Sequence, residues 1–210
     1  MNTRKFVSAI LLALSLIAGV QAQTATPVQA ETKEDETNLD TQLYLIVGTN
    51  QDVVESKLPA QLDPVVKQLR ATLPFKNYRL AATLINRVKN EGGLNLSWIG
   101  GPLASLTGIA PATTPSFSQF KVRQVRLVRN NEGQQLVQMQ GFNFGARIPI
   151  QTSGTIAASG AVAPTFNYEN TGLATEISMR ESEPVIVGTL NVGPSGDAII
   201  LVVSAKRTQK

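Results

Sequence analysis

The 210-residue sequence contains no cysteine and no histidine. Without cysteine there is no disulfide, so burial of apolar side chains has to hold the fold together. Without histidine the chain lacks the usual general base and the commonest zinc ligand. It also lacks a phosphate loop, a dinucleotide fingerprint and any metal-ligand spacing. We therefore predict a non-enzymatic protein with no catalytic residue, no cofactor and no metal.

The best enzymatic alternative is the pair Ser204 and Lys206. They are two residues apart on a predicted strand, so their side chains point to one face. A Ser-Lys nucleophile needs a buried lysine and a pair of oxyanion donors. Lys206 is followed by Arg207 and a polar tail, which indicates exposure. The stretch GPSGD at 193–197 is better explained as a hairpin turn.

The N-terminus predicts export. Two basic residues precede the apolar run 6–20, which is shorter than the ~20 residues of a spanning helix and ends close to Val-Gln-Ala. Residues 1–22 are therefore predicted to be a signal peptide. Cleavage after Ala30 instead of Ala22, or an uncleaved anchor, are the alternatives. We expect the protein in the periplasm, at the outer membrane or secreted.

The charge of the chain is only mildly basic. Removal of residues 1–22 would reduce the 19 basic side chains to 17 and leave the 15 acidic ones, a net charge of +2. This balance gives no argument for a nucleic-acid partner. One local group of cations is either a polyanion-binding strip or, the interpretation we favour, a charged outer face that discourages aggregation. It consists of Lys121, Arg123, Arg126 and Arg129.

The first part of the chain predicts a linker followed by a small α/β unit. Residues 23–40 are polar and acidic, which is typical of a flexible linker. The apolar run 43–48 predicts a buried strand, and a capping pattern at 52–55 predicts a short helix. Asp63-Pro64 then begins a helix with apolar residues at helical spacing. Residues 41–76 are thus predicted to form an α/β lead-in whose helix lies on the strand.

From residue 77 onward the apolar period is that of strands. Residues 77–210 predict a mainly β domain of antiparallel sheets in a sandwich-like arrangement. Residues 79–88 and 94–100 predict a strand pair joined by a glycine turn. A hairpin is predicted around Asn130-Asn131-Glu132-Gly133, and the apolar run 198–205 predicts the central strand of the final sheet.

Two stretches of small residues, 100–118 and 152–165, predict long loops, the second of them mobile. Between them lies "FNFGARIPIQTSG", 142–154, with a proline at its centre. Pro149 has no backbone N–H, so this segment is expected at a sheet edge, a bulge or a strand start.

Several segments resemble, in order, the secretins, the ring-forming outer-membrane gates of bacterial secretion and pilus systems. "LVRNNEG" and "GARIPI" resemble the family's Asn-Asn turn and Gly-x-x-Ile-Pro-Ile segment, and "FNYENTGL" resembles its aromatic-x-Tyr-x-x-x-Gly-Leu strand. The likeness covers about residues 78–205, and the order of the pieces is its stronger signal. The chain departs from the family at Ala81 and Asn86, where glutamates are usual, and at Thr189, which replaces a glycine.

The resemblance implies a gate or edge segment. Its residues would be Gly145, Ile148, Pro149, Ile150, Phe166, Tyr168 and Gly172. The alternative is that Ile148 and Ile150 are core residues that flank a bulge.

Two functions follow as hypotheses. The first is a secretin-like envelope protein that forms a homo-oligomer or joins secretion or pilus components at the outer membrane. The second is a soluble periplasmic or secreted β-sandwich that serves as an interaction module without forming a ring. Neither hypothesis involves nucleic acid.

Overall fold

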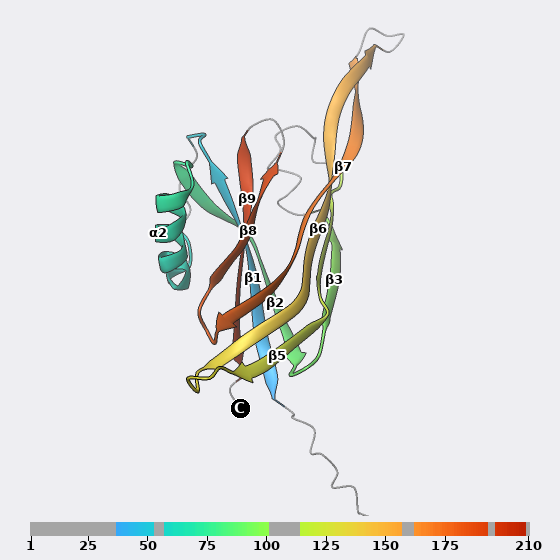
Figure 1. Ribbon diagram of the computed structural model, residues 1–210. Helices are drawn as coiled ribbons and strands as arrows, with labels where there is room; N and C mark the ends of the chain where they lie inside the picture. The colour runs from blue at the N-terminus through green and yellow to red at the C-terminus, as the bar shows by residue number, and fades with distance from the viewer. Residues whose placement is uncertain (1–36, 53–56, 101–113, 157–161, 193–195, 209–210) are drawn as a thin grey trace, which may run out of the picture. The chain divides into compact units, whose positions relative to one another are not determined.

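The computed structural model describes residues 37–52, 57–100, 114–156, 162–192 and 196–208 (Figure 1). The predicted signal peptide and almost all of the predicted linker lie outside these residues, as does most of the capping pattern at 52–55.

The described strands form two antiparallel sheets. Sheet A has the order β2-β1-β9-β8. In sheet B, β3 pairs with β4, and β6 pairs with β4, β5 and β7. Because β7 runs along β6 past both other partners, β4 and β5 share the opposite side of β6. The strands are β1 Asn38–Thr49, β2 Asn77–Lys89, β3 Leu94–Ile99, β4 Phe117–Val122, β5 Gln124–Arg129, β6 Gln135–Ile156, β7 Val162–Arg180, β8 Val185–Val192 and β9 Asp197–Arg207.

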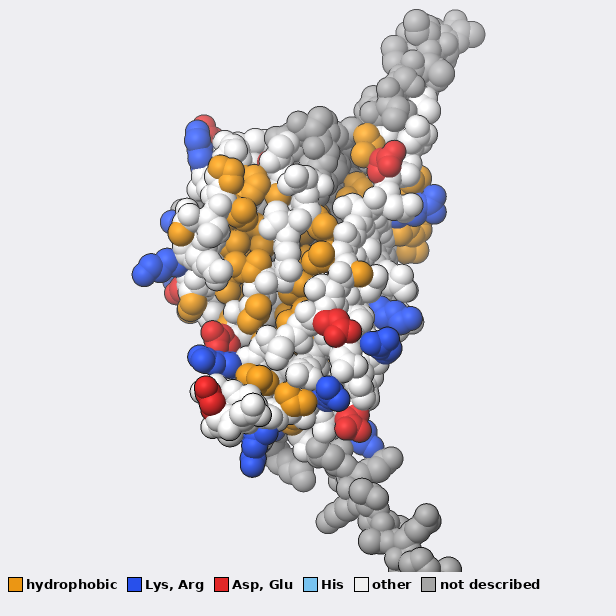
Figure 2. Space-filling view, viewed as in Figure 1, with side chains coloured by type: hydrophobic (Ala, Val, Ile, Leu, Met, Phe, Trp, Pro, Cys, Tyr) orange, Lys and Arg blue, Asp and Glu red, His pale blue; other side chains and the backbone are white. Residues whose placement is uncertain are grey.

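The main core lies between the two sheets. Along β4, buried and exposed side chains alternate, so one face of sheet B is buried there, whereas most residues of β1 and β9 are buried on both faces of sheet A. Leu43 and Leu45 of β1 belong to the same buried cluster as Phe120 of β4 and Phe142 and Phe144 of β6. Figure 2 shows hydrophobic side chains in the middle of the face turned to the viewer. The predicted sandwich-like β fold is confirmed.

A single described α-helix covers the other face of sheet A. Helix α2, Asp63–Thr72, follows a 3-10 turn at Ala60–Leu62. Its buried residues Val65 and Leu69 pack against a second apolar cluster that includes Tyr44, and Tyr78 donates a hydrogen bond to the Leu69 carbonyl at 3.0 Å. The predicted helix therefore lies on the first strand as expected. The predicted lead-in, 41–76, shares sheet A with the predicted β domain, because β1 pairs with β2 and β9.

The predicted pairing of 79–88 with 94–100 is wrong, although both segments are strands. β2 belongs to sheet A and β3 to sheet B, and the glycine turn between them crosses from one sheet to the other. At Gly93 the backbones approach so closely that an added Cβ would lie 2.6 Å from the Arg123 carbonyl oxygen. The turn thus connects the two sheets of the sandwich and does not close a hairpin.

The predicted loop at 152–165 is also largely wrong. β6 continues to Ile156 and β7 begins at Val162, and the two strands pair in register over these residues. Antiparallel strands pair through backbone N–H and C=O groups, which do not depend on the size of the side chain, so small residues can form this ladder. Residues 157–161 and the predicted loop residues 101–113 lie outside the described chain.

Two other local predictions are confirmed. The Asn130 side-chain oxygen accepts hydrogen bonds from the backbone of Glu132 and Gln134, which closes the β5–β6 hairpin, and Gly133 has a φ of 78°. β9 lies between β1 and β8, so it is a central strand of sheet A.

Two ion pairs connect segments that are distant in the sequence. Asp40 of β1 accepts a 2.8 Å hydrogen bond from Arg87 of β2, which lowers the pKa of Asp40. Glu181, in the β7–β8 turn, accepts hydrogen bonds from the side chain and backbone of Arg207. Burial by itself would raise the pKa of Glu181, but these contacts hold it below its usual value.

Candidate functional site at the base of the β6–β7 hairpin

All seven predicted gate residues lie on β6 and β7, where the two strands pair. Gly145 is opposite Gly172, and Pro149 is opposite Tyr168. The structure therefore brings together residues that lie far apart in the sequence. Ile148 is opposite Glu169, Ile150 is opposite Asn167, and Gln151 is opposite Phe166.

The seven residues divide between the two faces of the hairpin. Ile148 is 3% exposed and belongs to the main core, and Ile150 lies on the same face. The other five alternate with them and lie on the outer face of sheet B, the face turned away from sheet A. They are Gly145, Pro149, Phe166, Tyr168 and Gly172. Ile148 is thus a core residue, whereas Ile150 is half-buried and does not belong to the buried core cluster.

Pro149 lies where β6 becomes an edge strand. The last residue of β6 that pairs with β4 is Arg147, opposite Phe117. At Pro149 β7 is the only described strand that pairs with β6, so no described strand on the β4 side requires the missing N–H. Of the three places expected for Pro149, an edge, a bulge or a strand start, the pairing of β6 at this point corresponds to an edge, and a register shift follows between Gln151 and Ser153.

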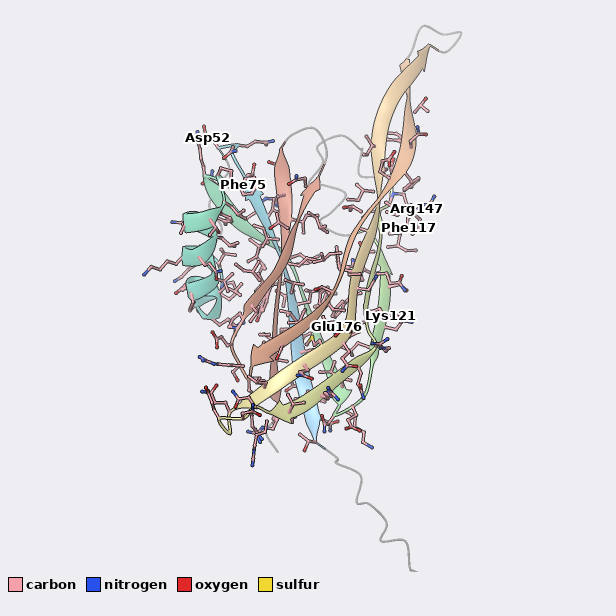
Figure 3. All side chains as sticks on the ribbon, in the orientation of Figure 1. Asp52, Phe75, Phe117, Lys121, Arg147 and Glu176 are labelled. Atoms are coloured by element: carbon pink, nitrogen blue, oxygen red, sulfur yellow. The ribbon has the colours of Figure 1, made fainter. Side chains whose placement is uncertain are left out.

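Tyr168 fastens the hairpin to β4. Its hydroxyl donates a 3.0 Å hydrogen bond to the Pro115 carbonyl, and its ring centroid lies 5.8 Å from that of Phe117. The Arg147 guanidinium carbon lies 5.1 Å from the Tyr168 ring centroid. Figure 3 shows Phe117 and Arg147 side by side on the outer face. We call Pro115, Phe117, Arg147 and Tyr168 the hairpin clamp.

Beyond the clamp the hairpin has two edges that pair with no other described strand, and we call them its open edges. β6 from Ile148 to Ile156 pairs with β7 alone, and the facing part of β7 pairs with β6 alone among the described strands. Figure 1 shows this part of β6 and β7 continuing past the ends of β3 and β4. Open edges expose rows of backbone donors and acceptors that can pair with another strand.

The two facing glycines have different reasons to be glycine. An added Cβ at Gly172 would lie 2.6 Å from the Phe144 carbonyl oxygen, so close packing of the strands requires glycine there. An added Cβ at Gly145 would meet nothing within 4 Å, and its φ is not positive. The fold itself gives no reason for glycine at 145.

The sequence pattern did not reveal three of the four clamp residues. Phe117 and Arg147 alternate with buried neighbours and so were detectable as outward-facing residues of strands, but nothing showed that they would meet. Pro115 contributes only its backbone carbonyl, which no sequence signal marks. Tyr168 alone was predicted, through the resemblance.

The described residues offer little for catalysis. They hold no group of three or more acidic, His or Cys side chains that could bind a metal. Ser204 of β9 lies opposite Gln42 of β1, and Lys206 is exposed. A Ser-Lys nucleophile needs a buried lysine, so this arrangement does not suit one. One open depression of about 290 Å³ lies on the outer face of sheet B, lined by Arg126, Gln138, Met139, Gln140, Glu176, Ile177 and Ser178.

No helix among the described residues is long and apolar enough to cross a membrane. No protein-family model matches the chain, and no curated protein matches its sequence.

Secretins are among the solved structures that match the chain. The Salmonella SPI-1 type III secretion injectisome secretin InvG matches 98% of this chain and 69% of its own, with 9% identity and a TM-score of 0.35. The same secretin in the open gate state matches 100% and 67%, with 10% identity and a TM-score of 0.37. PulD of the Klebsiella pneumoniae type II secretion system matches 83% and 39%, with 12% identity and a TM-score of 0.33. At these values the likeness does not decide the function of this protein.

We expect alanine at Gly172 and alanine at Gly145 to affect the free energy of unfolding differently. Gly172→Ala should lower the free energy of unfolding by about 1–3 kcal/mol, because the Cβ collides with backbone. Gly145→Ala should leave it unchanged or raise it by about 0.5–1 kcal/mol, because the space is open and glycine is unfavourable in a strand. Denaturant unfolding of both variants measures this. Equal destabilisation by the two substitutions would contradict the geometry.

The clamp should control local opening of the hairpin. Tyr168→Phe loses the hydrogen bond to Pro115 and keeps the ring contacts, while Tyr168→Ala loses all of them. Hydrogen exchange of the amides in 148–156 should therefore become faster in Tyr168→Phe, by about a factor of 5 for a bond of about 1 kcal/mol, and faster still in Tyr168→Ala. Amides of β9 serve as the internal control. Unchanged exchange in 148–156 would show that Tyr168 does not hold the hairpin.

Proposed function

We propose that this protein is a non-enzymatic, exported envelope protein that assembles into a homo-oligomer through its β6–β7 hairpin, as a component of a secretion or pilus apparatus at the outer membrane. Gly145, Ile148, Pro149, Ile150, Phe166, Tyr168 and Gly172 would form the base of the assembling segment. Its partners are further copies of the chain and the other components of that apparatus.

The pair of open edges beyond the clamp is the observation that carries this proposal. An isolated two-stranded ribbon is only marginally stable in water. Natural proteins usually cover, shorten or charge the edges of their sheets. Residues 148–156 and 162–169 contain a single charged side chain, Glu169. Strands from neighbouring copies would supply the missing backbone partners on both sides.

The clamp supports the proposal because it gives the hairpin a defined direction. Tyr168 is joined to the start of β4 by a hydrogen bond and by ring contacts with Phe117 and Arg147. β4 is itself part of the main core through Phe120 and Val122. A hairpin fixed at its base to a packed sheet can present the same edges in every copy, as a closed ring requires.

The order of the secretin-like sequence segments supports the same function. The Gly-x-x-Ile-Pro-Ile segment and the aromatic-x-Tyr-x-x-x-Gly-Leu strand occupy the two strands of this hairpin. The second candidate is a soluble interaction module that forms no ring. The completeness of the core between sheets A and B favours it, because the sandwich buries its apolar faces without another copy.

The native mass of the full-length chain tests the proposal. The protein should be recovered from separated soluble and membrane fractions, with and without mild detergent, and its mass compared with that of one chain, 22.5 kDa. Paired lysines at exposed positions of β7, Thr165→Lys with Asn167→Lys, should shift a large oligomer toward the monomer, because lysine on an edge opposes strand addition.

Gln68→Lys is the matched control, because Gln68 is exposed on α2, away from any strand edge. A large, membrane-associated oligomer that the β7 lysines dissociate and the control leaves intact would support the proposal. A soluble monomer without detergent would contradict it and favour the interaction module.

A further inference from the structure

The outer face of sheet B is a wide surface that no described helix covers. Helix α2 packs on sheet A, and the outer face of sheet B is turned away from it. The proposed assembly uses the edges of the hairpin, so it leaves this face free. β4, β6 and β7 present exposed or half-buried polar side chains there, among them Lys121, Gln138, Asn143, Arg147 and Asn170.

This face carries an excess of positive charge. Arg123 pairs with Glu176 at 3.7 Å, and both side chains are 69% exposed. Lys121, Arg126 and Arg147 form no ion pair with any of the residues that the structure describes. Figure 2 shows basic side chains along the side of the molecule where β4 to β7 lie. A second copy with the same face would be repelled, whereas an anionic partner would be attracted.

Side-chain amides are interleaved with these cations. Lys121 of β4 is opposite Asn143, and Arg147 is opposite Asn170. The Gln138 side-chain oxygen accepts two hydrogen bonds from Arg126, at 2.9 and 3.1 Å, which leaves its amide NH2 as a donor. A side-chain amide both donates and accepts hydrogen bonds, so it can bind hydroxyl groups as well as charged groups.

Gly145 leaves a gap in the middle of this face. It has open space where a side chain would stand, although a glycine inside a strand costs stability. Such a glycine often marks a place where a ligand approaches the backbone closely. Phe117, 39% exposed, and Tyr168 stand at one end of the gap, and each aromatic ring offers an apolar surface with a defined orientation.

We propose that the outer face of sheet B binds an acidic polysaccharide. The carboxylates of its sugars would pair with Lys121, Arg126 and Arg147, and its hydroxyls would pair with the amides beside them. A sugar ring would lie over Gly145, with its C–H face toward Phe117 and Tyr168. The open depression beside Arg126 and Gln138 continues the same surface, which suits a chain of sugars better than one small molecule.

Binding of the full-length protein to polygalacturonate tests the proposal, with dextran as the uncharged polysaccharide. We expect binding to polygalacturonate at low salt, at least tenfold weaker binding at 0.5 M NaCl, and none to dextran. Gly145→Thr should weaken binding at least tenfold without lowering stability, because the new side chain would occupy the gap that the sugar requires.

Lys121→Gln tests the contribution of charge, and Lys67→Gln on the exposed side of α2 is its matched control. We expect several-fold weaker binding for the first and no change for the second. Equal effects of Lys121→Gln and Lys67→Gln on binding would overturn the proposal. Unchanged affinity for polygalacturonate in Gly145→Thr would overturn it as well. Tighter binding to single-stranded DNA or to polyglutamate than to polygalacturonate would also overturn it. The native mass of each variant is measured alongside, so that binding is compared at one oligomeric state and the assembly through the hairpin edges is tested separately.

Discussion

The pairing of β6 with β7 is the interaction on which the rest of the structure depends. β6 is the only described strand that joins β4, β5 and β7, so it organises sheet B and supplies Phe142 and Phe144 to the core. The same pair of strands then leaves the sandwich as a hairpin. One continuous ladder thus links the buried core to the exposed edges proposed for assembly.

The sequence predicted where the strands and the helix lie better than it predicted which strands pair. Alternating apolar residues identified nearly every strand, and Asp63-Pro64 identified the helix, because local periodicity decides which face is buried. It did not show that the turn before β3 would cross between sheets, since a glycine turn looks the same in a hairpin and in a crossover. It also misassigned 152–165, where small residues conceal a ladder that only the partner strand reveals.

The candidate site was predictable in part for the same reason. The resemblance selected Pro149 and Tyr168, and the structure places them opposite each other. The clamp contacts with Phe117 and the Pro115 carbonyl depend on tertiary packing, which spacing along the chain does not encode. The lack of any intramolecular reason for Gly145 became visible only when the space around it could be described.

The most direct measurement is the distance between hairpins of neighbouring copies. Because the chain has no cysteine, Glu169→Cys would give a single site for a nitroxide spin label on exposed β7. Hairpins that pair edge to edge repeat every two strands, so labels on adjacent copies should lie about 10 Å apart and broaden the electron paramagnetic resonance spectrum strongly. An assembled but unbroadened sample, or a labelled protein that remains a monomer, would contradict assembly through the β6–β7 hairpin.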